Sequence, residues 1–314
     1  MLAPARRSPI VPGNTRERTG TGGILRRAYA DIRRRFAGLE ADVQAIFAGI
    51  RILPADLAAN DAAVQRTIYM LTPQELANVS AELQRALERW LADGKQPASA
   101  FWFAAYDAEA SQLGAAQSVT NLSALSTAYA AQRTLQQVLF SEPYRNRLAA
   151  SQIRSLDHWT GLGAQARAEL STIIGRAVVD GKNPRAVRSE IAEALGVSKG
   201  RALGYAQTDI TGTLREARWA EADHAADSMG MGIGLLHTSA LLPTTRASHA
   251  ARNGKVFTSA EVRAWYAKDG NRYRCHCAQT ECLLDDAGVP ILSDSLKRTM
   301  AKEREVWQRQ HSAE

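Results

Sequence analysis

The chain of 314 residues contains only three cysteines, Cys275, Cys277 and Cys282, and all of them lie within eight positions. An odd number of cysteines so close together provides no disulfide framework, so the sequence indicates a reducing compartment. No stretch approaches the roughly 20 apolar residues of a transmembrane helix. No apolar run follows Arg6 and Arg7, as a secretory signal would require. We therefore expect no membrane association and no secretion.

Several common catalytic motifs are also missing. The sequence has no H-E-x-x-H zinc motif and no G-x-S-x-G nucleophile motif, and Gly20–Gly23 lacks the Lys-Ser/Thr ending of a phosphate-binding loop. Gly230, Gly232 and Gly234 precede an expected strand, whereas a dinucleotide site needs its glycines ahead of a helix. These absences favour a protein that is not an enzyme.

The charge of the chain is unevenly distributed. Lys and Arg number 39 and Asp and Glu 32, which gives a net charge of +7. The first 35 residues hold the whole excess, because only Glu17 and Asp31 offset their nine arginines: Arg6, Arg7, Arg16, Arg18, Arg26, Arg27, Arg33, Arg34 and Arg35. Residues 1–22 are also rich in Pro and Gly, so we interpret them as a flexible basic arm. We expect the nine arginines to bind a polyanion or a partner protein.

Hydrophobic periodicity predicts a mostly α-helical chain, with an elongated helical body and a small C-terminal α+β module. Helices are expected at 23–47, 73–91, 99–114, 122–140, 163–179, 184–195, 198–226, 261–267 and 294–311, and strands at 235–238, 255–258 and 273–277. The predicted divisions are the arm 1–22, a helical N-terminal domain 23–160, a second helical region 161–234, the Cys/His-containing module 235–292 and a charged helix 293–314.

The three cysteines and the upstream His249 form the densest group of soft metal ligands. Thiolates and imidazole suit zinc in tetrahedral geometry, so Cys275, Cys277, Cys282 and His249 are a candidate structural zinc site. Alternation along a strand directs Cys275 and Cys277 to one face and His276 to the other. The alternative interpretation is three reduced cysteines that pack as small hydrophobic side chains.

A second basic concentration lies in the C-terminal part, where Tyr266 and Tyr273 stand among five basic residues. This basic patch consists of Arg246, Arg252, Lys255, Arg272 and Arg274. Basic side chains beside aromatic rings hold nucleic acid by charge and stacking. The alternative is a solvated surface without a ligand.

Several segments together resemble the phage Mu F-like head-morphogenesis family. They are Gly181-Lys182-Asn183-Pro184, Ile191 to Leu195, Arg201-Ala202, Ala206 to Ile210, Thr244 to Phe257 and Cys275-His276-Cys277. The resemblance is specific between about Leu162 and Leu284, and Thr15-Arg16 with the following helix also looks like the start of such minor head proteins. The sequence departs from the family at His237, where a Trp is usual, and at Gln207-Thr208-Asp209, which replaces Arg-Thr-Glu.

The resemblance implies a non-catalytic minor capsid protein of a tailed double-stranded DNA phage. It implies a location at the portal vertex inside the head, and in the host cytoplasm during assembly. The implied partners are the portal protein, the major capsid or scaffold protein, and packaged DNA.

Two other functions stay open at this point. One is a metal-dependent nuclease or toxin-like enzyme that uses His249 and the cysteines, although few carboxylates lie near them in the sequence. The other is a nucleic-acid-binding module that acts outside any virion.

Overall fold

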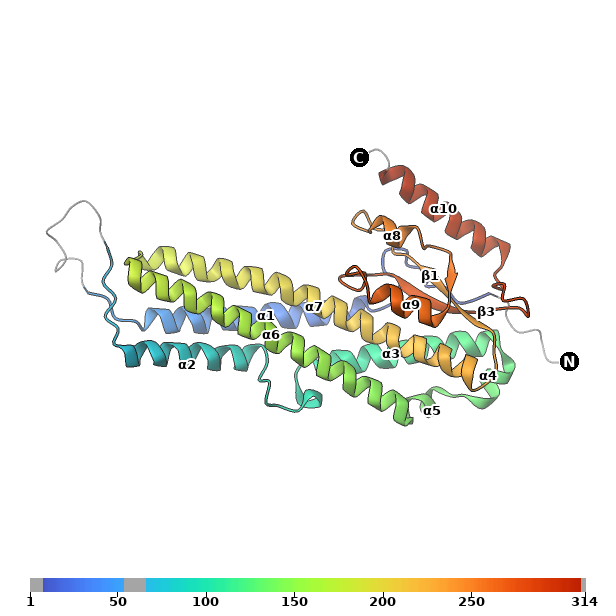
Figure 1. The fold of residues 1–314 in the computed structure, drawn as a ribbon, viewed down its shortest axis with the longest axis horizontal. Coiled ribbons are helices and arrows are strands. Elements are labelled where there is room, and N and C mark those ends of the chain that lie inside the picture. The colour runs from blue at the N-terminus through green and yellow to red at the C-terminus, as the bar shows by residue number, and fades with distance from the viewer. Residues whose placement is uncertain (1–7, 54–65, 312–314) are drawn as a thin grey trace. The chain divides into compact units, whose positions relative to one another are not determined.

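A computed structural model describes residues 8–53 and 66–311. The described residues are 67% helical, and they form ten α-helices and one small three-stranded antiparallel sheet near the C-terminus (Figure 1). This confirms the predicted fold class, a mostly helical chain with a small C-terminal α+β module. None of the described helices is both long enough and apolar enough to cross a bilayer.

Residue contacts divide the chain into two compact units, and each unit combines segments that are distant in sequence. Unit 1 comprises residues 1–26, 103–152 and 206–314, and unit 2 comprises residues 27–102 and 153–205. Three of the four boundaries fall inside helices, namely α1 (Gly22–Ala48), α6 (Glu142–Asp180) and α7 (Pro184–Asp227), and the fourth lies between residues 102 and 103. The sequence-based division with boundaries near 22, 160, 234 and 292 is contiguous and stays a prediction.

Unit 2 is built from four helical segments, namely α2 (Pro73–Trp90) and parts of α1, α6 and α7. Its core contains Ile32, Leu39, Val43, Leu83, Leu87, Leu162, Leu170, Ile174, Val187, Ile191 and Leu195. The predicted start of α2 is confirmed by a capping box, in which Thr72 and Glu75 each accept a hydrogen bond from the other's backbone N–H. Trp90 Nε1 donates to Asp42 Oδ2 over 2.8 Å, which links α2 to α1.

The sequence-based prediction of a helix break at Gly196 is wrong, because α7 runs without interruption from Pro184 to Asp227. Its buried side chains continue across Gly196, with Leu195 before it and Ala202 after it. A glycine inside a helix costs only about 1 kcal/mol relative to alanine. Burial of the apolar side on either flank therefore outweighs the low helix propensity of Gly196.

The single helix predicted at 122–140 is also wrong. The structure has α3 (Ala104–Leu125), α4 (Thr127–Gln132) and α5 (Leu135–Phe140) in this region, after a short 3-10 turn at Ala98–Ala100. Ser126 accepts a hydrogen bond from Tyr129 N, and Thr134 forms a capping box with Gln137. These hydroxyl caps start new helices within the apolar pattern, because each satisfies backbone N–H groups that a helix start leaves unpaired.

The sheet of unit 1 has β1 (Ile233–Thr238) in the middle, with β2 (Val256–Phe257) and β3 (Ala278–Leu283) antiparallel on either side. In Figure 1, β1 and β3 lie side by side, near the short helix α9 (Ser259–Tyr266). The predictions of β1, β2 and α9 are confirmed within a few residues. The strand predicted at 273–277 is wrong: Arg274 has a φ of 49°, outside the β region, and the third strand begins only at Ala278.

The C-terminal helix α10 (Asp294–His311) has the predicted bounds and packs in unit 1. Met300 and Trp307 are buried, and Trp307 Nε1 donates to the carbonyl of Leu242 over 2.9 Å. Arg304 donates to the carbonyl of Asn253 over 2.7 Å. A few apolar and several polar contacts therefore hold this strongly charged helix.

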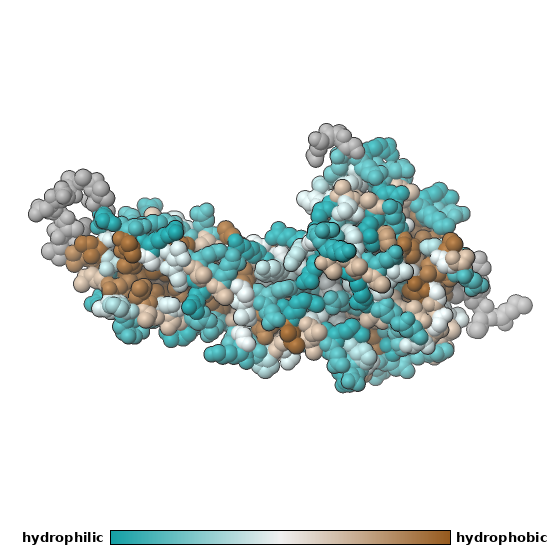
Figure 2. All heavy atoms as spheres, viewed as in Figure 1, coloured by the Kyte–Doolittle hydropathy of each residue, from teal (hydrophilic) through white to brown (hydrophobic). Residues whose placement is uncertain are grey.

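Unit 2 exposes apolar side chains where α1 ends and α2 begins. We call Ile52, Ile68, Met70 and Leu76 the apolar patch, and these side chains are 44–49% exposed. Apolar residues reach the surface at this end of unit 2 in Figure 2. An antiparallel bridge between Ile52 and Tyr69 joins the two segments that carry most of the patch.

Candidate metal centre

Three of the four predicted metal ligands converge in the core of unit 1. His249 Nδ1 lies 3.4 Å from Cys275 Sγ and 3.5 Å from Cys277 Sγ. One ligand atom from each residue lies within 4.8 Å of the others, and all three residues are buried. The cysteines are free thiols in the structure.

His249 is positioned by the short helix α8 (Ala247–Ala250). Arg246, the residue before this helix, donates hydrogen bonds to the carbonyls of Gly270, Asn271 and Tyr273 over 2.8 to 3.0 Å. These bonds tie α8 to the loop that leads into the cysteines. The imidazole and the two thiols therefore meet because a single guanidinium joins their two segments.

The cysteine loop is anchored from the other side by Arg215 of α7. Its buried guanidinium donates to the carbonyls of Cys275 and Cys277, over 2.6 and 3.0 Å, and lies 4.7 Å from the ring centre of Tyr266. These bonds occupy carbonyls that a strand would direct to a neighbouring strand. They explain why residues 275–277 are not part of β3.

The two thiols differ in acidity because they lie together beside a buried cation. Burial opposes ionisation of Cys275, but its hydrogen bond with Cys277, the charge of Arg215 and the contact with His249 hold its pKa well below the usual range. The same hydrogen bond, reinforced by burial, raises the pKa of Cys277 well above its usual range. Of the two cysteines, Cys275 is therefore the one that ionises more readily.

Two hydroxyl oxygens flank the sulfur atoms. Ser239 Oγ is 3.5 Å from Cys277 Sγ, and Tyr266 Oη is 3.6 Å from Cys275 Sγ. Tyr266 Oη also accepts a hydrogen bond from Gln279 Nε2, which donates to His237 Nδ1 as well, over 3.1 Å in each case. Burial lowers the pKa of His237 to about 3, so this ring is neutral at pH 7.

The fourth predicted ligand, Cys282, does not join this group. Its Sγ lies 3.5 Å from the carbonyl oxygen of Gly234, and the residue packs against Leu236 and Met300. Cys282 lies four residues beyond the first residue of β3, which is roughly 13 Å along a strand. His276 Nε2 lies 2.7 Å from Gln207 Nε2 of α7, and His276 is not one of the three clustered ligands.

Sequence reasoning missed Arg215, Ser239 and Tyr266, which surround the three ligands. Arg215 follows the buried Leu214 in a helix that continues to Arg218 and Glu221, so its pattern is that of an ordinary charged helix face. Only the tertiary contacts show that Arg215 is buried. No sequence signal separates it from the exposed arginines of the chain.

The arginines of the predicted arm have different environments. Arg6 and Arg7 lie outside the described residues. Arg16, Arg26, Arg27, Arg33 and Arg34 are exposed, and Arg35 is half-buried with its guanidinium 4.1 Å from the ring centre of Trp102.

Arg18 departs from the expectation of an exposed contact residue, because it is only 2% exposed. It donates to Glu303 Oε2 and to the carbonyl of Pro12, each over 2.7 Å. It also donates to the carbonyl of Ser239 over 3.3 Å. Arg18 is therefore committed to internal contacts and is not available to an external polyanion.

The basic patch is similarly divided. Arg246 binds loop carbonyls, and the half-buried Arg252 lies 3.5 Å from the ring centre of Phe257 and 4.4 Å from that of Trp265. Arg272 lies over Tyr273 at 5.7 Å, whereas Lys255 and Arg274 are exposed. Two of the five basic residues therefore serve mainly to hold the loops around the cysteine cluster.

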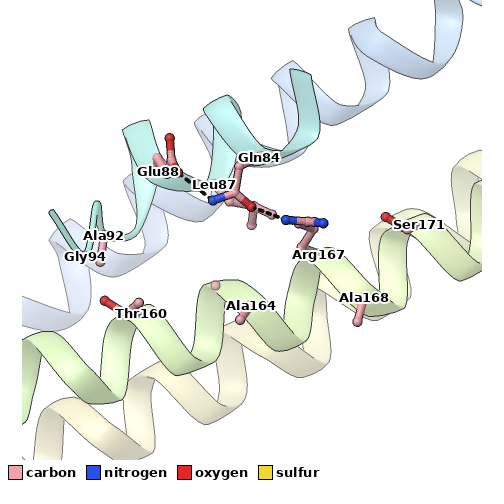
Figure 3. A pocket seen from close by; sticks show the side chains of 11 residues that line it. Gln84, Leu87, Glu88, Ala92, Gly94, Thr160, Ala164, Arg167, Ala168 and Ser171 are labelled. Atoms are coloured by element: carbon pink, nitrogen blue, oxygen red, sulfur yellow. Dashed lines mark hydrogen bonds between the residues drawn. The ribbon is translucent and has the colours of Figure 1, made fainter. Parts of the chain in front are cut away.

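Unit 2 contains a separate cavity of about 420 Å³ between α2 and α6 (Figure 3). Three of its polar residues bind one another: Arg167 donates to Gln84 Oε1 over 3.0 Å, and Gln84 donates to Glu88 over 2.6 Å. Helix α6, which carries Arg167, also lines the cavity with small side chains such as Ala164 and Ala168. This cavity lacks the convergent buried groups that distinguish the cysteine cluster.

Comparison with known proteins gives one match. The family model described as Phage Mu protein F like protein matches residues 168–280, a range that includes His249, Cys275 and Cys277. No curated protein and no solved structure matches the chain significantly. The match confirms the resemblance found in the sequence and points to a phage head morphogenesis protein.

Proposed function

We propose, from the Mu F-like character of residues 168–280, that this chain is a minor capsid protein that acts at the portal vertex during phage head assembly. The family match is the observation that carries this proposal. The portal protein and the major capsid or scaffold protein are the proposed partners, and the virion is the proposed location. The family match indicates the class of protein, and the partners and the location are proposed by analogy with that class.

The apolar patch supports a protein partner. The four side chains of the patch are each 44–49% exposed. Ile68, Met70 and Leu76 are near one another in the sequence, and the Ile52–Tyr69 bridge brings Ile52 next to them. Clustered exposed apolar side chains are typical of protein interaction surfaces.

The exposed arginines of α1 support an additional contact with packaged DNA. Arg27, Arg33 and Arg34 lie in the part of α1 that belongs to unit 2, and Arg27 and Arg34, seven residues or about two helical turns apart, share a helix face. Such a row binds phosphates by charge alone, without reading sequence. This contact does not need Arg18, which is buried.

A structural role fits the cysteine cluster better than nuclease activity does. His249, Cys275 and Cys277 are each at most 3% exposed. A hydrolytic metal centre needs an open coordination position that substrate and water reach. No observation favours the nuclease or an independent nucleic-acid-binding module over the capsid role.

Co-expression with the cognate portal protein tests the partner. We expect the chain to co-purify with portal oligomers, and the Ile68→Asp/Met70→Asp variant to lose most of this association while its circular dichroism stays unchanged. Wild-type chain that elutes entirely apart from the portal would contradict the proposal.

Binding to duplex DNA at several salt concentrations tests the second contact. Replacing both Arg33 and Arg34 by Gln should reduce the salt slope by about 2, because each phosphate that an arginine neutralises adds about 0.9 to that slope. Arg185→Gln/Arg188→Gln is the matched control, because it removes two exposed arginines from α7. Equal effects of the two double variants would mean that α1 is not the DNA-binding face.

A further inference from the structure

We propose that His249 Nδ1, Cys275 Sγ and Cys277 Sγ bind one zinc ion, with an oxygen in the fourth position and with Cys282 outside the site. The proposal concerns the folding of unit 1, and it stands independently of the portal and DNA contacts.

The two separations between the imidazole nitrogen and the sulfur atoms match the edges of a zinc tetrahedron. Zinc binds sulfur at about 2.3 Å and imidazole nitrogen at about 2.0 Å, so a tetrahedral N···S edge is about 3.5 Å. The two N···S separations are 3.4 and 3.5 Å. An ion therefore fits between these atoms with little movement of the chain.

The chemistry of the pocket also suits zinc. Two sulfurs and one imidazole are soft donors, and all three side chains are shielded from water. Two thiolates cancel the charge of the ion, so the loaded centre is neutral beside the buried guanidinium of Arg215. Cys277 N–H and Cys275 Sγ are 3.4 Å apart, which supplies the backbone hydrogen bond that a coordinated thiolate commonly accepts.

The imidazole of His249 is committed to the sulfur atoms. The ring is 2% exposed, and its Nε2 has no hydrogen-bond partner within the described part of the chain. Its polar contacts therefore run through Nδ1 to the two sulfurs. Trp265, whose ring centre is 4.6 Å away, and α8 already fix the orientation of the imidazole. Metal binding through Nδ1 would therefore cost little side-chain conformational entropy.

An oxygen suits the fourth position. Ser239 Oγ and Tyr266 Oη lie 3.5 and 3.6 Å from the two sulfurs, close to the O···S edge of about 3.5 Å expected for the same tetrahedron. Either hydroxyl would complete four-coordination without an open position. The ion would join α8 to the segment before β3, in a module whose strand β2 has only two residues. Its role is therefore structural, and its binding energy contributes to folding.

Elemental analysis of the full-length chain, purified without added metal, is the first test. We expect about one zinc per chain, and cobalt substitution should give the thiolate-to-metal charge-transfer absorption of a two-cysteine site. Removing the metal with a chelator should lower the melting temperature, and adding zinc should restore it. Protein that is purified without metal, and whose melting temperature changes with neither chelator nor added zinc, would overturn the proposal.

Cys282→Ser is the matched control, because Cys282 is equally buried in the same sheet region. We expect Cys275→Ser and Cys277→Ser to lose at least tenfold in zinc affinity and Cys282→Ser to retain it. Cys277→His serves if the serine variants do not fold, since it keeps a zinc ligand but removes one thiolate, and the cobalt charge-transfer band should fall by about half. Loss of zinc in Cys282→Ser equal to that in Cys275→Ser would refute the three-residue site. Portal association is measured separately, so failure of one proposal is distinct from failure of the other.

Discussion

Arg218 of α7 and Glu281 of β3 form an ion pair that is almost completely removed from solvent. Arg218 Nη2 lies 2.6 Å from Glu281 Oε2, and their side chains are 3% and 0% exposed. Ser118 and Asn121 of α3 also donate to the same carboxylate, each over 2.9 Å. One buried carboxylate therefore joins two helices and the sheet of unit 1.

Replacing Glu281 by Gln should destabilise the protein by about 3–5 kcal/mol, because it leaves the guanidinium of Arg218 buried without a counter-charge. Denaturant unfolding followed by circular dichroism measures this free energy. Asp294→Asn is the control, since the Asp294–Lys297 pair is exposed at 80% and 54% with a separation of 3.9 Å. An exposed pair of this kind contributes about 0–1 kcal/mol. Similar losses of unfolding free energy in both variants would show that burial does not strengthen the contribution of the Arg218–Glu281 pair.

Glu281 should also set part of the acid sensitivity of the protein. Burial raises the pKa of Glu281, but the charge and hydrogen bonds of Arg218, together with Asn121, outweigh burial and place it below its ordinary value of 4.5. A carboxyl whose pKa is lowered by folding stabilises the native state above the unfolded pKa, and this contribution is lost as pH falls through the folded pKa. Unfolding free energies measured between pH 7 and the acid range should decline less steeply in Glu281→Gln than in the wild type. An identical pH slope would contradict the assignment.

Gly114 and Gly161 should respond oppositely to alanine. A Cβ at Gly114 would lie 2.3 Å from the carbonyl oxygen of Leu214, whereas nothing lies within 4 Å of a Cβ at Gly161. We expect Gly114→Ala to lose about 1–3 kcal/mol by forcing α3 away from α7. Gly161→Ala should gain up to about 1 kcal/mol from helix propensity. Thermal unfolding of both variants decides this, and a stabilised Gly114→Ala would mean that the two helices are less closely packed than described.

The contact between Arg18 and Glu303 should protect the N-terminal segment from proteolysis. Glu303→Gln removes the ion pair and leaves every trypsin site in place, so cleavage after Arg18 should accelerate under native conditions. Glu305→Gln is the control, because Glu305 is exposed on the same helix. Limited trypsin digestion followed by mass spectrometry measures the rate, and equal rates in both variants would show that Glu303 does not hold the segment.

Helices whose ends are set by neighbouring residues in the sequence were predicted correctly. The predicted start of α2 at residue 73 is confirmed, and α10 has the predicted bounds. The continuity of α7 through Gly196 was missed, because a glycine is a local stop signal and the buried flanks that override it are tertiary.

The candidate site was predictable in its residue types but only partly in its membership. The residue types and their spacing correctly identified His249, Cys275 and Cys277 as a group of soft ligands. The same spacing wrongly included Cys282, which lies further along β3 beside Gly234. The burial of Arg18 and Arg215 was not predictable, because each depends on carbonyls and carboxylates that are distant in sequence. The charge count placed Arg18 in the flexible basic arm.

The end residues of the family match, 168 and 280, matter for anyone who expresses only part of this chain. A fragment of residues 168–280 would end inside β3, so it would lack Glu281 and the last residues that pair with Ile233 and Gly234. It would also omit α3, whose Ser118 and Asn121 bind that carboxylate. Such a fragment should be insoluble or molten, whereas a design that retains residues 8–311 preserves every contact of the sheet. The matched region is therefore not expected to fold as an independent domain, because its sheet depends on contacts with the flanking segments.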